Sequence, residues 1–388
     1  CKSKLEKFFV PICDSKFYLR TIVARNYSTK ARESDCEKRM PMLLIHGFAS
    51  GVGLFCKNLD SLSETRRVYA FDLLGFGRSS RPPLPETAEE IEMKYVEVIE
   101  EWRKNMDLDK FILLGHSMGG FLATSYALSY PERVVHLVLA DPWGFVGQDE
   151  AANNSKNGVR DWFVKKLTSF RGLSFMRMLG PFGLNALRKM RQDFEPIYSQ
   201  SAPSSKKTNG LVRESPDISM LNSKSSEGKH FKSEKAKVGD IEGLSPYDPA
   251  VVYNYIYHIN CRHPTGEEAF RNLCQMPGWA ARPMLLRIPQ VAADLPITFI
   301  FGGRSWIDMS SGLQARTLRP NSYVDVMVIE GGGHHAYAQY ADDFNAYVNA
   351  IASLVDEDHV FVPGSEALVQ EAVATAKRST DYPSSSSE

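Results

Sequence analysis

The stretch FILLGHSMGG, residues 111–120, decides the fold. An apolar run long enough for a buried strand leads into a Gly-x-Ser-x-Gly turn, and the following FLATSYAL opens a helix. A strand, a tight turn and a helix in this order form a nucleophile elbow, which lifts a serine hydroxyl clear of the sheet. Gly115 and Gly119 let strand and helix approach where a side chain would clash. We therefore predict Ser117 as a nucleophile and the Met118 N–H as an oxyanion donor.

The segments around the elbow alternate between strands and helices. Apolar runs typical of strands lie at residues 17–24, 41–45, 68–72, 134–140, 296–301 and 323–329, and helical patterns lie at 86–105 and 341–355. This alternation predicts an α/β protein with a mostly parallel sheet and helices on both faces. We expect the core to comprise residues 1–145 and 291–356.

The alternation stops between the two halves of the core. Residues 146–290 carry helical patterns and loops without a convincing strand, which predicts a cap inserted over the active site. Within the cap, residues 199–243 are rich in Ser, Lys and Glu, so we expect a disordered excursion there. Residues 357–388, which end in a run of serines, are predicted to form a mobile tail.

Composition narrows the class of protein. The 388 residues are 43% apolar, which suffices for a large core, and 46 basic residues balance 46 acidic ones, so charge does not indicate nucleic-acid binding. The six cysteines form no Cys-x-x-Cys pair, which favours free thiols in a reducing compartment. No apolar run approaches the roughly 18 residues of a membrane span. We expect a soluble or peripherally attached intracellular protein that needs no metal or cofactor.

Two later strands end in residues that complement the serine. A serine nucleophile needs a base and an orienting carboxylate, and in this type of sheet the chain order is Ser, acid, His. Asp308 and His334 each follow one of the last two predicted strands, at carboxyl ends where open α/β sheets place their sites. We predict a triad of Ser117, Asp308 and His334, with His335 as the rival base and Asp141 as the rival acid.

A further loop contributes to the predicted site. The second apolar strand runs into His46-Gly47-Phe48 and a series of small residues. A strand ending in His-Gly is where a hydrolase with a nucleophile elbow places its first oxyanion donor. We assign that donor to the Phe48 N–H, with His46 and Gly47, together with Gly115 and Gly119, as supporting residues.

Two segments combine apolar residues with cations. In the first half of the cap, Phe163, Leu167 and Phe170 fall on one helical face among Lys and Arg residues. Such a face suits a membrane or lipid-droplet surface, and it equally suits packing over a pocket. The patch FFVP at residues 8–11 allows the same two interpretations, a weak lipid anchor or packing on the domain.

Several longer motifs accompany the elbow. They are YAFDLLGFGRSSRP at 69–82, DPWGF at 141–145, GPFG at 180–183, YIYH at 255–258, GWA at 278–280, RPML at 282–285, and the segments around Asp308 and His334. With these motifs the chain resembles the α/β-hydrolase subfamily that contains the N-acyl-phospholipid lysophospholipase and the comparative-gene-identification lipid-droplet lipase coactivator. The resemblance implies the α/β-hydrolase fold, a helical cap, and acyl-ester hydrolysis on glycerophospholipids or N-acyl phospholipids.

The subfamily divides at the elbow. The coactivator branch carries Asn in place of the nucleophile, so Ser117 implies an enzyme, whereas Arg304 and Gly333 resemble the coactivator branch. The family's His-x-x-x-x-Asp pattern, linked by resemblance to acyl transfer, ends here in Gln339. Two alternatives to hydrolysis follow from the resemblance: a droplet-bound coactivator of a triglyceride lipase, and a lysophosphatidic acid acyltransferase. It also implies a lipid substrate and peripheral association with lipid droplets, endoplasmic reticulum or mitochondria.

Overall fold

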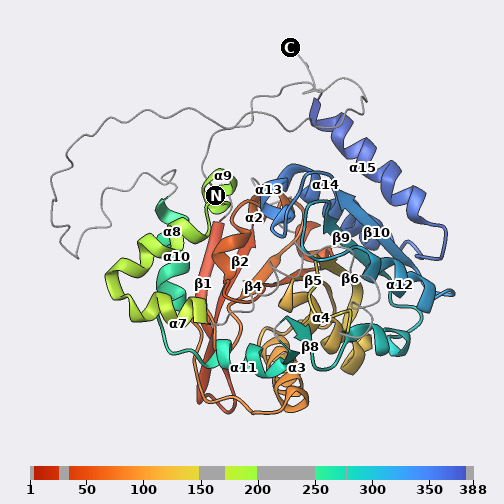
Figure 1. Ribbon diagram of the computed structural model, residues 1–388. Coiled ribbons are helices and arrows are strands. Elements are labelled where there is room, and N and C mark those ends of the chain that lie inside the picture. The colour runs from red at the N-terminus through yellow and green to blue at the C-terminus, as the bar shows by residue number, and fades with distance from the viewer. Residues whose placement is uncertain (1–3, 26–34, 148–170, 199–249, 277, 382–388) are drawn as a thin grey trace, which may run out of the picture.

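The computed structural model describes residues 4–25, 35–147, 171–198, 250–276 and 278–381 (Figure 1). One eight-stranded sheet has the order β1-β2-β4-β3-β5-β6-β9-β10. The strands are β1 (Lys4–Ile12), β2 (Phe17–Arg25), β3 (Met42–Ile45), β4 (Val68–Phe71), β5 (Phe111–His116), β6 (Val134–Ala140), β9 (Ile297–Gly302) and β10 (Val324–Ile329). From β4 to β10 all pairs are parallel, while β1 and β2 are antiparallel additions. The predicted α/β-hydrolase fold with a mostly parallel sheet is confirmed.

Helices cover both faces of this sheet because its central strands are apolar on both faces. Every residue of β3, β5 and β9 is buried. One face packs against α3 (Ala88–Asn105), α4 (Met118–Ser129) and α12 (Ser310–Leu318), and the other against α2 (Leu59–Leu62), α13 (Ala336–Gln339), α14 (Ala341–Asp356) and α15 (Glu366–Asp381). Because the strands from β4 to β10 are parallel, the loops at their carboxyl ends lie together along one edge of the sheet.

The described part of the region between β6 and β9 is helical except for one short hairpin. It contains α7 (Arg171–Met178), α8 (Gly183–Met190), α9 (Phe194–Tyr198), α10 (Ala250–Asn260), α11 (Thr265–Leu273) and the strands β7 (Cys274–Met276) and β8 (Trp279–Ala280). The first four helices share a small core of their own, which includes Met176, Leu187, Phe194 and Ile256. The predicted excursion at 199–243 and the amphipathic residues at 163–170 lie outside the described residues.

The two ends of the chain compare differently with the predictions. The apolar patch at 8–11 belongs to β1, which pairs with β2 along its whole length. Phe8 and Val10 pack against the core, as one of the two interpretations predicted, while Phe9 is 53% exposed. The prediction of a mobile tail from residue 357 is wrong for the segment that forms α15. Val369 and Val373 of this helix are buried against the core, and that burial is what the interpretation as a tail overlooked.

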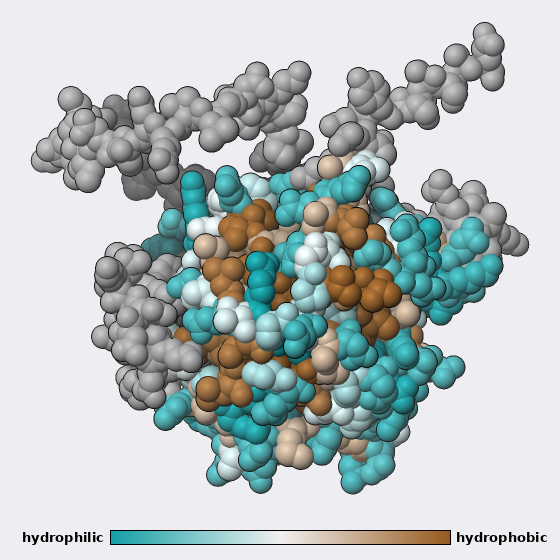
Figure 2. All heavy atoms as spheres, turned by 90° about the vertical axis from the view of Figure 1, so that its right-hand side faces the viewer, coloured by the Kyte–Doolittle hydropathy of each residue, from teal (hydrophilic) through white to brown (hydrophobic). Residues whose placement is uncertain are grey.

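Apolar side chains remain exposed at the β10 edge of the sheet. Figure 2 shows this end of the molecule, where hydrophobic patches alternate with polar residues. Val328 of β10 and Leu313 and Leu318 of α12 are among the exposed apolar residues. Within the described ranges, no helix is both long enough and apolar enough to cross a lipid bilayer.

Candidate active site

Ser117 lies at the bend between β5 and α4. Its backbone has φ 55° and ψ −122°, a region that residues other than glycine rarely adopt and that is enriched at active sites. A Cβ on Gly119 would lie 2.3 Å from the carbonyl oxygen of Ile45, and one on Gly115 would lie 2.3 Å from the carbonyl oxygen of Gly119. Only glycine at these two positions therefore allows β3, β5 and α4 to meet around the serine.

His334 lies in the loop after β10, and its ring joins the serine to a carboxylate. Its Nε2 is 3.0 Å from Ser117 Oγ, and its Nδ1 is 2.5 Å from Oδ2 of Asp141. Because a carboxylate only accepts hydrogen bonds, the proton of the neutral imidazole belongs on Nδ1. Nε2 is then free to accept the hydroxyl proton of Ser117. This arrangement has the geometry of a serine nucleophile with its base, and the carboxylate is placed where it would stabilise an imidazolium.

Asp141 directly follows β6, and hydrogen bonds from several neighbouring groups fix its carboxylate. Its Oδ2 also accepts a hydrogen bond from the Ser305 hydroxyl, and its Oδ1 lies 3.3 Å from the Gly302 N–H at the end of β9. Because β6 and β9 are adjacent parallel strands, their ends bring these groups together. The carboxylate, which is 2% exposed, is thus fixed toward His334.

The structure corrects the assignment of Asp308 as the acid. Oδ1 of Asp308 accepts a hydrogen bond from the Ser310 N–H at 3.0 Å, at the start of α12, and the residue lines a small hollow of about 40 Å³ together with Trp306. Asp141, the rival acid, is the carboxylate that contacts Nδ1 of His334. Asp141 directly follows β6, whereas Asp308 lies beyond the loop after β9, where its carboxylate is engaged at the start of α12.

Burial governs the electrostatics of the pair. Loss of water lowers the pKa of His334, with a further contribution from the nearby Arg191 cation, and it raises the pKa of Asp141. His334 is therefore neutral near pH 7 and can act as a base. Burial also lowers the pKa of the neighbouring His116 to about 3. The neutral His116 holds the loop by donating from Nε2 to the carbonyl oxygen of His334 at 2.8 Å.

The rival base, His335, belongs to an aromatic cluster. Its ring centroid lies 5.2 Å from the rings of His116 and Phe194 and 5.9 Å from that of Tyr337. Burial lowers its pKa well below the usual value. The imidazole within hydrogen-bond distance of the Ser117 hydroxyl is that of His334.

The loop after β3 runs beside the elbow. A Cβ on Gly47 would lie 2.9 Å from the Ser117 Cβ, so this backbone passes directly along the nucleophile. His46 fixes the loop by donating from Nδ1 to the Gly47 carbonyl oxygen at 2.8 Å and accepting at Nε2 a backbone N–H of the loop after β4 at 2.9 Å. Phe48 comes next in this loop, and Met118 opens α4, whose first N–H groups have no partner within the helix. Both N–H groups remain proposed oxyanion donors.

Reasoning from sequence missed Arg191, which lies between α8 and α9. Its guanidinium carbon is 3.7 Å from the centroid of the Phe194 ring, and that ring meets His335 edge to face at 5.2 Å. Asp193 holds the guanidinium through two hydrogen bonds of 2.9 and 2.8 Å. The rings of Phe194 and His335 thus separate the Arg191 cation from His334. No local motif marks this arginine, so its position emerges only from the packing of α8 and α9.

Comparisons with known proteins agree with this architecture. The family model described as alpha/beta hydrolase fold matches residues 40–341. The 1-acylglycerol-3-phosphate O-acyltransferase ABHD5 of Homo sapiens is 41% identical over 321 residues, which cover 82% of this chain and 79% of the relative. The (lyso)-N-acylphosphatidylethanolamine lipase of Bos taurus is 38% identical over 349 residues, 88% of each chain.

Solved structures are similar in fold at low sequence identity. A bacterial membrane phospholipase A, described as a virulence factor, has a TM-score of 0.56 at 18% identity, covering 90% of this chain and 86% of its own. The 2-hydroxy-6-oxo-6-phenylhexa-2,4-dienoate hydrolase of Rhodococcus sp. strain RHA1 has a TM-score of 0.56 at 14% identity, covering 89% of this chain and 98% of its own. At this identity the likeness concerns the fold alone.

Proposed function

The chain belongs to the α/β-hydrolase family, as its sequence motifs predicted, and from this premise we propose that it is a serine acyl hydrolase that cleaves acyl esters of glycerophospholipids or N-acyl phospholipids. The observation that carries the proposal is the hydrogen-bonded series from Ser117 through His334 to Asp141. A hydroxyl, an imidazole and a carboxylate in this order suit acyl transfer through a covalent acyl-serine.

The reaction proceeds in two halves. Ser117 Oγ attacks the acyl carbonyl carbon while Nε2 of His334 takes the hydroxyl proton, and Asp141 stabilises the imidazolium. The N–H groups of Phe48 and Met118 stabilise the oxyanion. The tetrahedral intermediate expels the lysolipid alkoxide, which receives its proton from His334. Water then attacks the acyl-serine, again losing a proton to His334, and the second intermediate releases a fatty acid and restores the serine.

Replacement of the nucleophile tests the proposal. Ser117→Ala is expected to lose hydrolysis of a lysophospholipid by roughly 10⁶-fold, the order seen when a serine hydrolase loses its nucleophile, and to lose labelling by a fluorophosphonate probe. Ser125→Ala is the matched control, because the Ser125 hydroxyl donates to the Phe121 carbonyl oxygen within α4. Unchanged turnover in Ser117→Ala, with labelling mapped to another residue, contradicts the assignment.

Arg191 supports a substrate that carries a phosphate. A guanidinium has five N–H donors, and Asp193 engages two of them. Among the contacts of the described residues the other donors of Arg191 are not engaged, and Asp193 fixes the plane in which they point. Planar, fixed donors suit the oxygens of a phosphate. The two relatives are named for an acylglycerol phosphate and an acylated phosphatidylethanolamine, both phosphate-bearing lipids.

A comparison of charged and neutral substrates tests this role. Hydrogen bonds to charged groups contribute about 1.5–3 kcal/mol, so Arg191→Met is expected to lower kcat/KM for a lysophospholipid by about 10- to 100-fold. Its effect on an uncharged monoacylglycerol is expected to be small. Arg188→Met on α8 removes a nearby cation of the same kind and serves as the control. An equal loss on both substrates assigns Arg191 a structural role instead.

Exposed apolar residues in the segment 175–190 support peripheral contact with a lipid surface. Phe175 of α7 and Met190 of α8 are about half exposed, and Met178 and Phe182 are 76% and 72% exposed. Arg188 and Lys189 on α8 add positive charge to the same segment. Exposed apolar residues flanked by cations are what an interfacial helix presents to anionic lipid. Phe182→Ser combined with Met178→Ser is expected to reduce sedimentation with phosphatidylserine-containing vesicles; Val360→Ser, remote from the cap, is the control.

Acyl transfer is a second candidate, because an alcohol can resolve an acyl-serine in place of water and one relative is named as an acyltransferase. Gln339 stands where the His-x-x-x-x-Asp pattern has Asp. Its side-chain oxygen accepts the N–H of Gly333, the residue before His334, at 2.8 Å. Labelled acyl-CoA and lysophosphatidic acid, incubated with wild type and Ser117→Ala, test for transfer. If wild type and Ser117→Ala stimulate a separate triglyceride lipase equally, that result favours the coactivator alternative.

A further inference from the structure

The end of β9 and the loop after it, residues 302–305, run directly against the loop that carries His334. The Arg304 N–H donates to the Gly332 carbonyl oxygen at 2.8 Å. A Cβ on Gly302 would lie 2.5 Å from the same oxygen, so only glycine at this position allows the two loops to approach so closely. The loop after β9 is therefore fixed in place relative to His334.

Ser305 of this loop donates its hydroxyl hydrogen bond to Asp141. The acceptor is Oδ2, the same carboxylate oxygen that lies 2.5 Å from Nδ1 of His334. On its other side, the Ser305 oxygen accepts the Ile307 N–H at 3.1 Å. A carboxylate only accepts hydrogen bonds, so the single proton of the hydroxyl lies on the contact with Asp141. Two donors from two different loops thus meet on one oxygen of the acid.

Neutral groups stabilise the charge of this buried carboxylate. Burial raises the pKa of Asp141 to about 7, and the hydrogen bonds from the Ser305 hydroxyl and the Gly302 N–H act in the opposite direction. The titratable groups that face it are His116 at the end of β5 and His334 after β10, and burial lowers the pKa of both. Within the described residues, no lysine or arginine lies at ion-pair distance from this carboxylate. The Ser305 hydroxyl therefore does for the acid what a cation does elsewhere.

We propose that Ser305 is a positioning residue that keeps Asp141 ionised and directed at His334 near neutral pH. The inference rests on the proposed hydrolysis for its effect on the reaction, and it concerns how pH regulates the same site. A donated hydrogen bond favours the carboxylate over the carboxylic acid. Without it, Asp141 gains a proton at a higher pH, and the charge that stabilises the imidazolium of His334 is lost there.

The pH dependence of hydrolysis separates this role from a merely structural one. In Ser305→Ala the acid limb of kcat/KM for a short-chain p-nitrophenyl ester is expected to move up by about one to two pH units. With a wild-type midpoint near pH 7, kcat/KM at that pH then drops by about 5- to 50-fold, and the wild-type plateau returns at higher pH. Ser305→Thr keeps the hydroxyl and is expected to keep the profile. A loss at every pH with an unmoved midpoint overturns the proposal.

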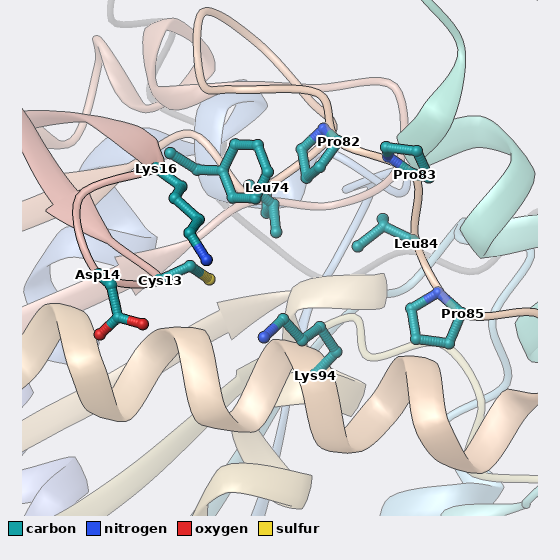
Figure 3. A pocket seen from close by; sticks show the side chains of 10 residues that line it. Cys13, Asp14, Lys16, Leu74, Pro82, Pro83, Leu84, Pro85 and Lys94 are labelled. Atoms are coloured by element: carbon teal, nitrogen blue, oxygen red, sulfur yellow. The ribbon is translucent and has the colours of Figure 1, made fainter.

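Two matched variants control for the loss of a hydroxyl and for a change of net charge. Ser311→Ala removes a neighbouring hydroxyl, which donates to the Asp308 carbonyl oxygen at 3.1 Å instead of to a carboxylate. Lys94→Gln removes a cation from a cavity of about 510 Å³ between the β1–β2 turn, the loop after β4 and α3 (Figure 3). Both are expected to keep the wild-type midpoint. A shift in either one as large as that of Ser305→Ala refutes a specific role for Ser305.

A spectroscopic titration tests the proposal without any hydrolysis. In Ser117→Ala labelled with ¹⁵N-histidine, the downfield proton resonance of His334 Nδ1–H, assigned by its loss in His334→Gln, reports the pH at which the pair with Asp141 takes up its first proton. Adding Ser305→Ala is expected to raise that pH by about one to two units.

The outcomes of this titration are independent of the substrate. An unmoved midpoint overturns the role of Ser305 whether or not the wild-type protein cleaves phospholipids. A raised midpoint in a protein without hydrolytic activity upholds it and refutes the proposed function instead. If thermal melting shows that Ser305→Ala is unfolded, Ser305→Cys takes its place; because a thiol is a weaker donor, a smaller shift in the same direction is expected, and no shift overturns the proposal.

Discussion

The choice between two carboxylates can be tested directly. Asp141 and Asp308 both follow strands of the same sheet, and the structure places Asp141 at 2.5 Å from Nδ1 of His334. We predict that Asp141→Asn reduces hydrolysis far more than Asp308→Asn. The two substitutions are matched, because each exchanges a carboxylate for an amide of nearly the same shape.

The magnitude follows from the hydrogen bonds. An amide nitrogen at the position of Oδ2 donates to Nδ1 of His334, which moves the ring proton to Nε2 and removes the acceptor for the Ser117 hydroxyl. In a serine protease the equivalent change lowers kcat by about 10⁴-fold, or about 5 kcal/mol of transition-state stabilisation. Asp308→Asn retains an oxygen that accepts the Ser310 N–H, so its cost is expected to stay below about tenfold.

The assay uses a soluble short-chain p-nitrophenyl ester, which avoids effects of membrane binding, and fluorophosphonate labelling as an independent measure of serine activation. Thermal melting checks that Asp141→Asn is folded, since the amide oxygen can still accept the Gly302 N–H. If Asp308→Asn loses as much activity as Asp141→Asn, or more, the assignment of Asp141 is refuted and Asp308 is the acid.

Three further predictions concern pH and stability. Burial lowers the pKa of His334 but raises that of Asp141 to about 7, so the first proton that the pair takes up on acidification cancels the carboxylate charge that stabilises the imidazolium; kcat/KM is expected to fall as the pH drops through about 7, and a profile that stays flat well below that pH contradicts this. In Gly119→Ala the added Cβ meets the Ile45 carbonyl oxygen at 2.3 Å, so unfolding free energy is expected to drop by about 3 kcal/mol or more in urea titrations, with loss of activity. Asp356→Asn leaves the guanidinium of Arg66, 0% exposed, without its charge partner at 2.8 Å; a loss of about 3 kcal/mol is expected, and an unchanged thermal midpoint argues against it.

Much of the fold was predictable because it depends on local pattern. The fully buried strands β3, β5 and β9 appear in the sequence as continuous apolar runs, and α14 begins and ends within one residue of the predicted 341–355. The exceptions depend on distant contacts. The FFVP patch becomes part of β1 only through its pairing with β2, and the tail becomes α15 only because Val369 and Val373 pack on the core.

The residues of the site likewise divide into those that a local motif predicts and those whose position depends on distant contacts. The bend at Ser117 is encoded by the glycines immediately around it, so a short motif suffices to predict its geometry. The acid is different, since two aspartates follow strands and the chain order Ser, acid, His admits both. Which one reaches His334 depends on how the loops after β6, β9 and β10 pack against one another, and no single segment encodes that packing. Arg191 could not be predicted from any local segment, because only the packing of α8 and α9 places it near the histidines.

The same separation bears on how the proposed hydrolase would select between hydrolysis and acyl transfer. A nucleophile, a base and an acid account for acyl-serine formation, and all three belong to strand ends of the rigid sheet. The groups that would select a phosphate head group or admit an acceptor alcohol, Arg191 above all, belong to the cap and to loops that meet it. If catalysis and selection are separated in this way, variants of Arg191 alter the ranking of substrates while leaving fluorophosphonate labelling of Ser117 intact, and variants of Asp141 do the reverse. A variant of Arg191 that abolishes labelling as well would show that the cap takes part in activating the serine.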